Sequence, residues 1–497
     1  MLINSPSAAT ILLFVRLLNA ASGSNLLRKF GRCGMRFINR ELELQSLNQQ
    51  WKKDEAQLIV IYGKRRVGKT ELSIHFSQSK SRIYFLCDRT SMHKQLQKFT
   101  EMAGKYFKDE FLPSGGFKDW IEAFKYISHK NKKMIIIIDE FPYLAETDNA
   151  IPSVFQKIWD LYLKDSKIYL ILQGSSIAMM EKTLLVYNAP LYGRRTGQLL
   201  VKPFQFKEVL DMFPDKSFEE VLSIYSIVGG TPLYLNKFIS KSYIEVVKKE
   251  ILQKGQPLYE EVEFLLREEL KEPRNYFVIL EALSLGKRKL SEIINETGFD
   301  KGTVSRYISI LDTLQITRKE IPVTEKIPEK SRKGIYRIDD NFFNFWFRFV
   351  FRNRSFLEEG RIDEAVIQIQ KAMPVILAQN YEKAAIEILR RLFSKHKISL
   401  SFESYGRWWD KDKEIDLVAT NYHTNEILFG EVKWSNKQVG TNIYEDLKKK
   451  AQTVEWGKKG RKEYFAIFSK AGFTKDMVEL AEKDKVFLIH KDELLRF

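Results

Sequence analysis

Short, uninterrupted apolar runs recur through the first 200 residues, and stretches with helical spacing of apolar positions separate them. The runs are Leu58–Tyr62, Ile83–Leu86, Met134–Ile138 and Ile168–Leu172. A strand that is buried on both faces needs apolar residues at every position, whereas a half-exposed strand alternates. Strands that alternate with helices in this way predict an α/β fold with a doubly wound parallel sheet, extending to about Leu200.

The pattern changes after Pro203. Residues 203–271 have mostly helical spacing and are punctuated by a Gly-Gly-Thr-Pro sequence at 229–232. Three short helical segments then lie within Asn275–Ile316, followed by a β-like segment that ends in GIYRIDD. Three helices and a hairpin are the pattern of a winged helix-turn-helix, with Lys301–Leu314 as its recognition helix.

The C-terminal third begins with an unusually aromatic segment, NFFNFWFRFVFRNR, at Asn341–Arg354. Beyond it we expect one long helix at Asn380–Phe393 and then a run of strands, which lie near Ile398–Phe402, Glu414–Ala419, Ile427–Lys433, Tyr464–Phe468 and Phe487–His490. The complete division that we expect is an N-terminal extension (1–34), a parallel-sheet core (35–202), a helical lid (203–271), a winged helix (272–340), an aromatic connector (341–371) and a C-terminal α/β domain (372–497).

Residues 1–34 need separate treatment. Ile11–Ala20 is apolar, but it is shorter than the roughly 18 residues that cross a bilayer and it contains Arg16. A signal peptide is conceivable, yet the motifs of the downstream chain are typical of an intracellular protein. We therefore expect a dispensable extension, from a start codon placed too early, on a cytoplasmic protein with no membrane partner.

A phosphate-binding loop follows the first apolar run. The sequence G-x-x-x-x-G-K-T is complete and comprises Gly63, Lys64, Arg65, Arg66, Val67, Gly68, Lys69 and Thr70. Glycines let the backbone turn its N–H groups toward phosphates, the lysine reaches the terminal phosphates, and the threonine hydroxyl ligates Mg²⁺. Because a buried strand precedes the motif and a helix follows it, we expect ATP and Mg²⁺ to bind here.

Two carboxylates follow the third apolar run. Asp139 and Glu140 come directly after four isoleucines, at the edge of the sheet where ligands bind in such folds. Asp139 is expected to hold Mg²⁺, and Glu140 to orient and deprotonate the attacking water. The competing interpretation is an ordinary acidic pair that solvates a loop.

Weaker candidates lie farther along the core. Ser175, after the fourth run, is placed to sense the γ-phosphate, although Gly-Ser-Ser after a strand is often only a turn. Arg194 and Arg195 are candidates for an arginine finger that neutralises transition-state charge. A solvated basic pair is an equally good interpretation of the two arginines.

Several motifs occur in a specific order: FINRELELQSL, IYGKRRVGKTEL, IIIIDEFPYL, LQGSSIAMME, LYGRRTG and VGGTPLYL. Over about Arg36–Lys271 the chain resembles an archaeal and bacterial P-loop ATPase family related to the STAND branch of AAA+ proteins. The resemblance implies ATP binding, slow switch-like hydrolysis, and a winged helix that moves with the nucleotide state.

A second set of charged residues lies on two C-terminal strands. Glu431 and Lys433 share a strand face, and Asp416 faces Glu431 if the two strands form a hairpin. The carboxylates would bind Mg²⁺ or Mn²⁺, while the lysine positions the attacking water or the phosphate. Glu382, on the preceding helix, would complete the metal site.

This arrangement resembles the PD-(D/E)xK endonuclease-like fold over about Ala372–Phe497, although no proline precedes Asp416. The resemblance implies metal-dependent DNA cleavage. The alternative is an endonuclease-like domain that binds nucleic acid without cutting it.

The charge balance bears on the partner. The chain has 81 basic and 64 acidic residues, a formal charge of +17, which suits a polyanion but also suits a lysine-rich solvated surface. Exposed cations are expected around the wing, at Arg318, Lys319, Lys326, Lys330, Arg332 and Lys333. Two cysteines and scattered histidines provide no disulfide framework and no zinc-site spacing.

The sequence therefore predicts an ATP-hydrolysing switch that binds DNA and carries a metal-dependent nuclease-like domain. The rival is an ATP-dependent regulator or scaffold whose distal domains bind a protein partner or a second copy of the chain without cutting DNA. A DNA-binding regulator with an inactive nuclease fold lies between the two.

Overall fold

The computed structural model describes residues 37–110, 112–270, 272–396 and 398–496, and the chain divides into two compact units, Met1–Glu41 and Leu42–Phe497. The extension expected at 1–34 lies outside the described residues. Among the residues that are described, no helix combines the length and the apolar character needed to cross a membrane.

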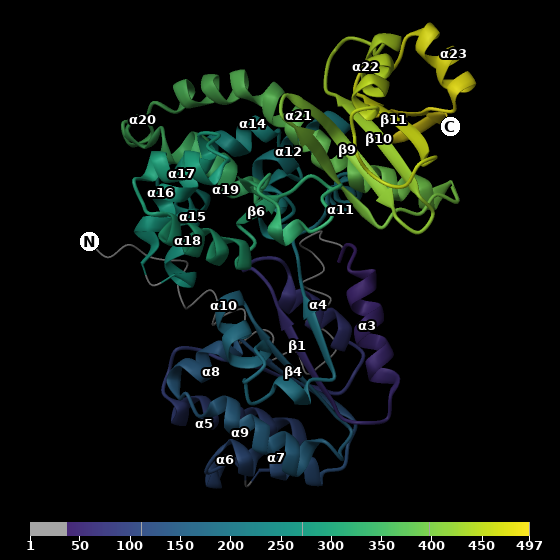
Figure 1. Ribbon diagram of the computed structural model, residues 1–497. Coiled ribbons are helices and arrows are strands. Elements are labelled where there is room, and N and C mark those ends of the chain that lie inside the picture. The colour runs from purple at the N-terminus through teal and green to yellow at the C-terminus, as the bar shows by residue number, and fades with distance from the viewer. Residues whose placement is uncertain (1–36, 111, 271, 397, 497) are drawn as a thin grey trace. The chain divides into compact units, whose positions relative to one another are not determined.

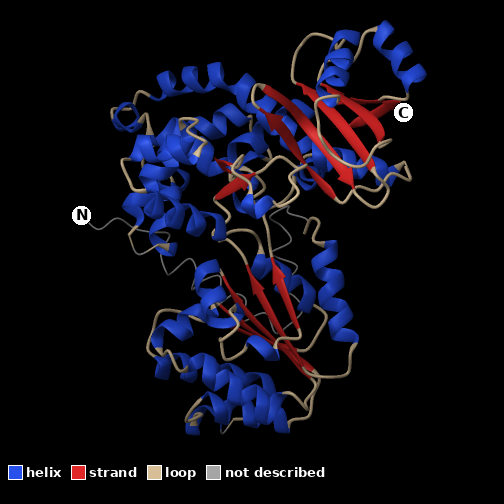
Figure 2. Ribbon diagram, in the orientation of Figure 1, coloured by secondary structure: helices blue, strands red, loops and turns tan. Residues whose placement is uncertain are grey.

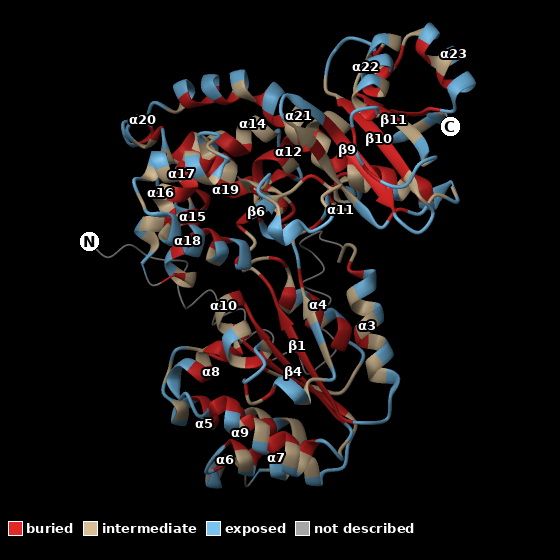
Figure 3. Ribbon diagram, in the orientation of Figure 1, coloured by how far each residue is buried: buried red, intermediate tan, exposed pale blue. Residues whose placement is uncertain are grey.

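A five-stranded parallel sheet forms the core of the N-terminal half (Figure 1). Its order is β2 (Arg82–Leu86), β3 (Met134–Asp139), β4 (Ile168–Gly174), β1 (Gln57–Tyr62) and β5 (Gly197–Leu200). The four apolar runs form four of these strands, and every residue of β1, β3 and β4 is buried (Figure 3). The α/β class and the parallel sheet are thus confirmed. β5 was not predicted, because its sequence, GQLL, is short and only half-buried.

Helices connect the strands, as crossover connections in a parallel sheet require. They are α4 (Lys69–Ser77), α5 (Met92–Phe107), α7 (Trp120–His129), α8 (Phe141–Thr147), α9 (Ile151–Ile158) and α10 (Ile177–Met180). The carboxyl ends of β1, β3 and β4 therefore meet at one edge of the sheet, where the phosphate-binding loop and the acidic pair both lie.

The segment after the sheet is helical, as expected. It contains α11 (Phe206–Met212), α12 (Phe218–Val228), α13 (Pro232–Leu235), α14 (Tyr243–Val246) and α15 (Pro257–Glu269). Three helices and an antiparallel hairpin follow: α16 (Pro273–Ser284), α17 (Leu290–Thr297), α18 (Lys301–Thr313), β6 (Thr317–Glu320) and β7 (Ile335–Ile338). This is the order of elements that the sequence pattern predicts for residues 275–340.

The aromatic segment is helical and buried. It forms α19 (Asn341–Trp346) and a further turn, and α20 (Arg354–Glu358) comes next. The following helix, α21, spans Ile362–Lys395 and has 34 residues, so the helix predicted at Asn380–Phe393 was much too short. Pro374 lies inside α21, where a proline ordinarily disrupts a helix, and burial of residues on both sides of it stabilises the continuous helix instead.

A separate six-stranded mixed sheet forms the C-terminal part (Figure 2). Its order is β13 (Glu493–Arg496), β12 (Phe487–His490), β11 (Lys462–Ser469), β10 (Glu426–Lys433), β9 (Lys413–Asn421) and β8 (Ser404–Asp410). The hairpin expected between the Asp416 and Glu431 strands is present, with Gly430 opposite Leu417. Helix α21 packs on one side of β9 and β10, while α22 (Thr441–Ala451) also contacts both strands and α23 (Lys475–Asp484) contacts β12 and β13.

The strand predicted at Ile398–Phe402 is absent, and these residues approach the edge strand β8 as irregular chain. Their alternating apolar pattern has another cause: Phe402 is buried in the core, and Ile398 and Leu400 pack against it. The segment pairs with no strand along its length, so the alternation reflects packing onto α21 rather than a sheet.

Candidate functional site

The phosphate-binding loop has the backbone that its glycines permit. Gly63 has φ 151° and Gly68 has φ 92°, both in the region that favours glycine. A Cβ atom at Gly63 would lie only 2.2 Å from the backbone oxygen of Val201, so no larger residue fits there. Arg66 also has a positive φ, 69°. The loop therefore has the tight turn that brings backbone N–H groups together around a phosphate.

Lys69, at the start of α4, is almost completely buried. Its Nζ atom donates to the backbone oxygens of Gly63 and Lys64, at 2.9 Å each. Burial lowers the pKa of Lys69 to about 8, and the nearby charges of Glu140 and Asp139 oppose that shift. The ammonium group is thus held inside the loop, beside the expected phosphate position.

Asp139 connects the two predicted halves of the nucleotide site. Its Oδ2 atom accepts hydrogen bonds from the Thr70 hydroxyl at 2.8 Å and from the Tyr84 hydroxyl at 2.5 Å. The expected proximity of Thr70 and Asp139 is therefore present. Tyr84 was missed, because an aromatic residue in a strand has the pattern of core; burial and the charge of Asp139 raise the pKa of its hydroxyl.

Glu140 and Ser175 are brought together from the ends of β3 and β4. The backbone N–H of Ser175 donates to Glu140 Oε2 at 3.1 Å, and the Ser175 hydroxyl donates to Oε1. Glu140 also has φ 55°, a left-handed conformation that is uncommon for a residue with a side chain. Such backbone strain concentrates at functional sites. The adjacent Ser176 donates to Glu269 of α15 at 2.9 Å.

Three consecutive cations of the loop are paired with acids from downstream helices. Lys64 Nζ lies 2.7 Å from Asp340, which is the N-cap of α19. On α15, Glu268 pairs with Arg65 at 2.7 Å and Glu261 pairs with Arg66 at 2.6 Å. No local sequence pattern indicates these partners, which are separated from the loop by about 200 residues or more.

The two candidate finger arginines differ in their contacts. Arg194 forms a bidentate pair with Asp160, with nitrogen–oxygen distances of 2.9 to 3.2 Å. Arg195 is half-buried, lies over the ring of Tyr192 and donates to Gln198. Arg194 is therefore held in place within its own chain, and the arginine-finger role stays a prediction.

The C-terminal charged residues converge at one place. Asp416 Oδ2 accepts from the backbone N–H of Val432 at 2.9 Å, and Lys433 Nζ lies 2.7 Å from Glu431 Oε1. Burial and the charge of Glu431 raise the pKa of Asp416 to about 6. Burial and the charge of Asp416 raise the pKa of Glu382, on α21, to about 7. These mutual effects indicate that all four predicted residues lie near one another.

Two further basic residues lie at this place, where the sequence did not predict them. Lys450, on α22, lies 3.2 Å from both carboxylate oxygens of Glu431, and Arg407, on β8, lies 3.9 Å from Glu382. Both belong to elements whose position relative to β10 depends on the tertiary fold. Among the described residues, no group of three or more His, Cys, Asp or Glu side chains is arranged to hold a metal ion.

The expected recognition helix has the predicted burial pattern. Val304, Ile308 and Leu311 of α18 are buried, whereas Ser305 and Arg306 are exposed. All the cations named around the wing are exposed. Lys333 nevertheless already forms an ion pair within the chain, with Asp410 of β8 at 3.0 Å.

Comparison with known proteins agrees with the nucleotide-site geometry. Residues 37–238 match a family described as an ATPase domain predominantly from Archaea, and residues 346–449 match a family of archaeal and bacterial proteins of unknown function. An uncharacterised protein of Methanocaldococcus jannaschii is 37% identical over 439 residues, which cover 87% of this chain and 95% of that protein. An uncharacterised ATP-binding protein of the same organism is 23% identical and covers 51% of this chain and 83% of its own length.

Solved structures of low identity also align with the chain. The Walker-type ATPase of Pyrococcus abyssi is 22% identical, with a TM-score of 0.47, covering 63% of this chain and 96% of that one. The ORC2 protein of Aeropyrum pernix is 12% identical, with a TM-score of 0.40, covering 66% of this chain and 96% of that one. The complete phosphate-binding loop, the matched ATPase domain and the relative that aligns with 87% of this chain together establish that this chain is an ATPase of the predominantly archaeal P-loop family.

Proposed function

We propose that this ATPase is a nucleotide-dependent switch that binds DNA and cleaves it with a metal ion held by its C-terminal part. The convergence of Glu382, Asp416, Glu431 and Lys433 on two paired strands and one helix carries the proposal. Acidic and basic side chains that perturb one another's pKa in a partly enclosed place are typical of reactive sites.

At the nucleotide site, the residues present fit a Mg²⁺–ATP complex. The Thr70 hydroxyl and the Asp139 carboxylate already lie 2.8 Å apart, and both are ligands that Mg²⁺ prefers. Mg²⁺ would neutralise charge on the phosphates. Glu140 would accept a proton from the attacking water, and Ser175 would hold the carboxylate at the edge of the sheet until that step.

The cations of the phosphate-binding loop would couple ATP binding to the position of the downstream helices. Lys64, Arg65 and Arg66 pair with acids of α15 and α19, and phosphates compete with carboxylates for the same cations. Binding of ATP would therefore weaken the contacts that hold these helices against the loop. The segments that would move when ATP binds are the helical lid (203–271), the proposed winged helix (272–340) and the aromatic connector (341–371).

DNA binding is assigned to the three helices and hairpin at 273–338, which we propose are a winged helix. The exposed Ser305 and Arg306 of α18 would meet base edges, while exposed cations of the wing, such as Lys326 and Arg332, would contact phosphates.

Cleavage is assigned to the C-terminal part, residues 372–497. Asp416 and Glu431 would hold Mg²⁺ or Mn²⁺, and Lys433 would orient the attacking water beside the phosphate. Water would add to phosphorus as the bond to the leaving oxygen breaks, leaving a phosphate monoester and a hydroxyl. Glu382, whose pKa is about 7, would exchange a proton with bulk water near the site.

One observation favours the rival, an ATP-dependent regulator with a non-catalytic C-terminal part. Glu431 is neutralised by two lysines, Lys433 and Lys450, and a carboxylate already paired in this way binds a cation less well. In this alternative the same basic residues would bind a polyanion without cutting it.

One assay separates the two functions. Purified protein is incubated with plasmid, single-stranded and branched DNA, with and without ATP and with Mg²⁺ or Mn²⁺. Metal-dependent cutting that Asp416→Ala abolishes would support the nuclease. If the protein binds DNA but does not cut it with either metal, the result would support the ATP-dependent regulator.

A further inference from the structure

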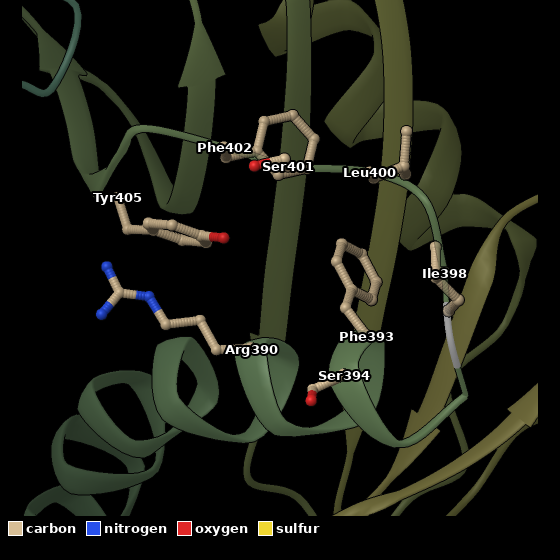
Figure 4. Close-up of a pocket in the computed structure, with 8 residues that line it drawn as sticks. All are labelled: Arg390, Phe393, Ser394, Ile398, Leu400, Ser401, Phe402 and Tyr405. Atoms are coloured by element: carbon tan, nitrogen blue, oxygen red, sulfur yellow. The ribbon is translucent and has the colours of Figure 1, made fainter. Parts of the chain in front are cut away.

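A cavity of about 370 Å³ opens between the C-terminal end of α21 and the chain that leads into β8 (Figure 4). Its volume falls in the range of roughly 300–1,000 Å³ that is usual for small-ligand sites. Three aromatic residues, Phe393, Phe402 and Tyr405, line it together with Arg390 and two serines, Ser394 and Ser401. None of these residues takes part in the sites described above.

The side chains of this cavity have the chemistry that recognises a nucleobase. Tyr405 and Phe393 lie on facing sides, with Arg390 beside Tyr405 (Figure 4). The guanidinium of Arg390 lies 4.0 Å from the centre of the Tyr405 ring, so a cation and an aromatic face are already stacked. Arg390 is exposed, and no carboxylate of the described residues lies within ion-pair distance of it, although the charge of Glu387, three residues earlier on α21, interacts with it. Its N–H groups are thus available to a phosphate.

The cavity and the proposed cleavage site share two elements, α21 and β8. Arg390 and Glu382 both lie on α21, roughly 12 Å apart along its axis at 1.5 Å per residue. Tyr405 and Arg407 both lie on the edge strand β8, and Arg407 contacts Glu382. At about 3.4 Å of rise per nucleotide, this distance corresponds to a few nucleotides of one strand.

We infer that this cavity binds an unpaired nucleobase of the DNA strand whose phosphate lies at the Asp416–Glu431 site. The base stacks against Tyr405, the serine hydroxyls contact its polar edge, and Arg390 binds the adjoining phosphate. This inference rests on the proposed DNA function. The inference specifies the substrate class of that function, namely DNA with a single-stranded or frayed segment next to the cut.

The test uses the full chain and a short single-stranded oligodeoxynucleotide that carries 2-aminopurine, in EDTA so that no metal-dependent cutting occurs. Binding to the wild type should quench the 2-aminopurine fluorescence, as stacking does. Tyr405→Leu should remove the quench and weaken binding by about 5- to 150-fold, the loss of one base–aromatic stack. Tyr405→Phe should behave like the wild type. Arg390→Gln should reduce the slope of log K against log salt by about 0.7, corresponding to one phosphate contact.

Two further variants guard against misfolding. Ser394→Trp, at an exposed position on α21, fills the cavity without removing an aromatic residue and should also abolish the quench. Tyr187→Leu changes a tyrosine that is 86% exposed in the ATPase part and should change nothing. All variants should retain wild-type ATPase rates.

The outcomes distinguish failure of the proposed base site from failure of the proposed DNA cleavage. A quench that persists in Tyr405→Leu and Ser394→Trp, or a wild type that binds no single-stranded DNA, overturns the base site. A quench that both variants lose supports it, even if the wild type never cuts DNA. In that case only the cleavage proposal fails.

Discussion

The ammonium nitrogen of Lys64, in the phosphate-binding loop, lies 2.7 Å from Oδ2 of Asp340, the residue that caps α19. Asp340 accepts from the backbone N–H groups of Phe342 and Phe343 through Oδ1, so its two oxygens serve different parts of the chain. The same carboxylate therefore fixes the start of a downstream helix and neutralises a cation of the nucleotide site.

This relationship predicts the effect of Asp340→Asn. Asparagine caps a helix as well as aspartate does, but it removes the negative charge from Lys64. The phosphates of ATP then no longer have to displace a carboxylate from Lys64. ATP should therefore bind about two- to fivefold more tightly, which corresponds to the loss of a Lys64–Asp340 ion pair that contributes about 0.5–1 kcal/mol. Titration with a fluorescent ATP analogue measures the change. Asp340→Ala removes the cap as well and should lower thermal stability; equal affinity in Asp340→Asn and the wild type would contradict the competition.

The contact between Ser175 and Glu140 predicts that substitutions at these residues affect ATP hydrolysis more than ATP binding. Glu140→Gln should retain ATP binding and reduce hydrolysis by about 10²- to 10⁴-fold, because it removes the proposed base. Ser175→Ala frees the carboxylate from its hydroxyl donor while leaving the backbone donor in place, so its turnover should fall by less. Phosphate release and nucleotide titration measure the two quantities separately. Wild-type turnover in Glu140→Gln would show that the water is activated elsewhere.

Lys69 predicts a pH dependence of ATP binding. Burial lowers its pKa in the empty site to about 8, whereas bound phosphates favour the charged form and raise the pKa. Binding should therefore take up a proton above pH 8, and ATP affinity should fall as the pH rises through this value. Below about pH 7 the lysine is already charged, so the uptake should vanish.

Calorimetric titrations in buffers with different heats of ionisation count the protons taken up. Lys69→Arg provides the control, because a guanidinium stays charged throughout this range. Proton uptake that is identical in Lys69→Arg would assign the linkage to another group.

The C-terminal site predicts three separable effects. Asp416→Ala should weaken Mn²⁺ binding and abolish cleavage, because it removes a proposed metal ligand. Lys433→Ala should spare metal binding yet stop cleavage, because the role proposed for the lysine is to act on water and phosphate. Both variants should hydrolyse ATP normally, because the phosphate-binding loop lies on the other sheet. Wild-type cleavage by Asp416→Ala would expose a contaminating nuclease.

DNA binding should weaken steeply with salt. Each phosphate that a lysine or arginine neutralises contributes about 0.9 to the slope of log K against log salt on duplex DNA. Arg332→Gln should therefore reduce the slope by about that amount. Lys333→Gln should reduce it less, because Lys333 already pairs with Asp410 and Glu325. A flat salt response in the wild type would favour a protein partner for the proposed winged helix.

The sequence by itself determined the elements whose signal is local. Four continuous apolar runs specified four parallel strands, because only a doubly covered sheet buries every position. Gly63 and Gly68 specified the loop, because its turns need φ values that larger residues rarely adopt. The charged residues Asp416, Glu431 and Lys433 were found because strand alternation fixes which neighbours share a face.

The tertiary structure alone decided the contacts made over long separations. Glu261, Glu268 and Asp340 pair with the loop cations only because α15 and α19 fold back onto it, and no local pattern records that approach. Lys450 joins Glu431 because α22 packs across β10, and α21 continues through Pro374 because burial on both sides outweighs the lost backbone hydrogen bond. Local spacing determines which face a side chain takes, but the partner it meets there depends on how distant elements pack.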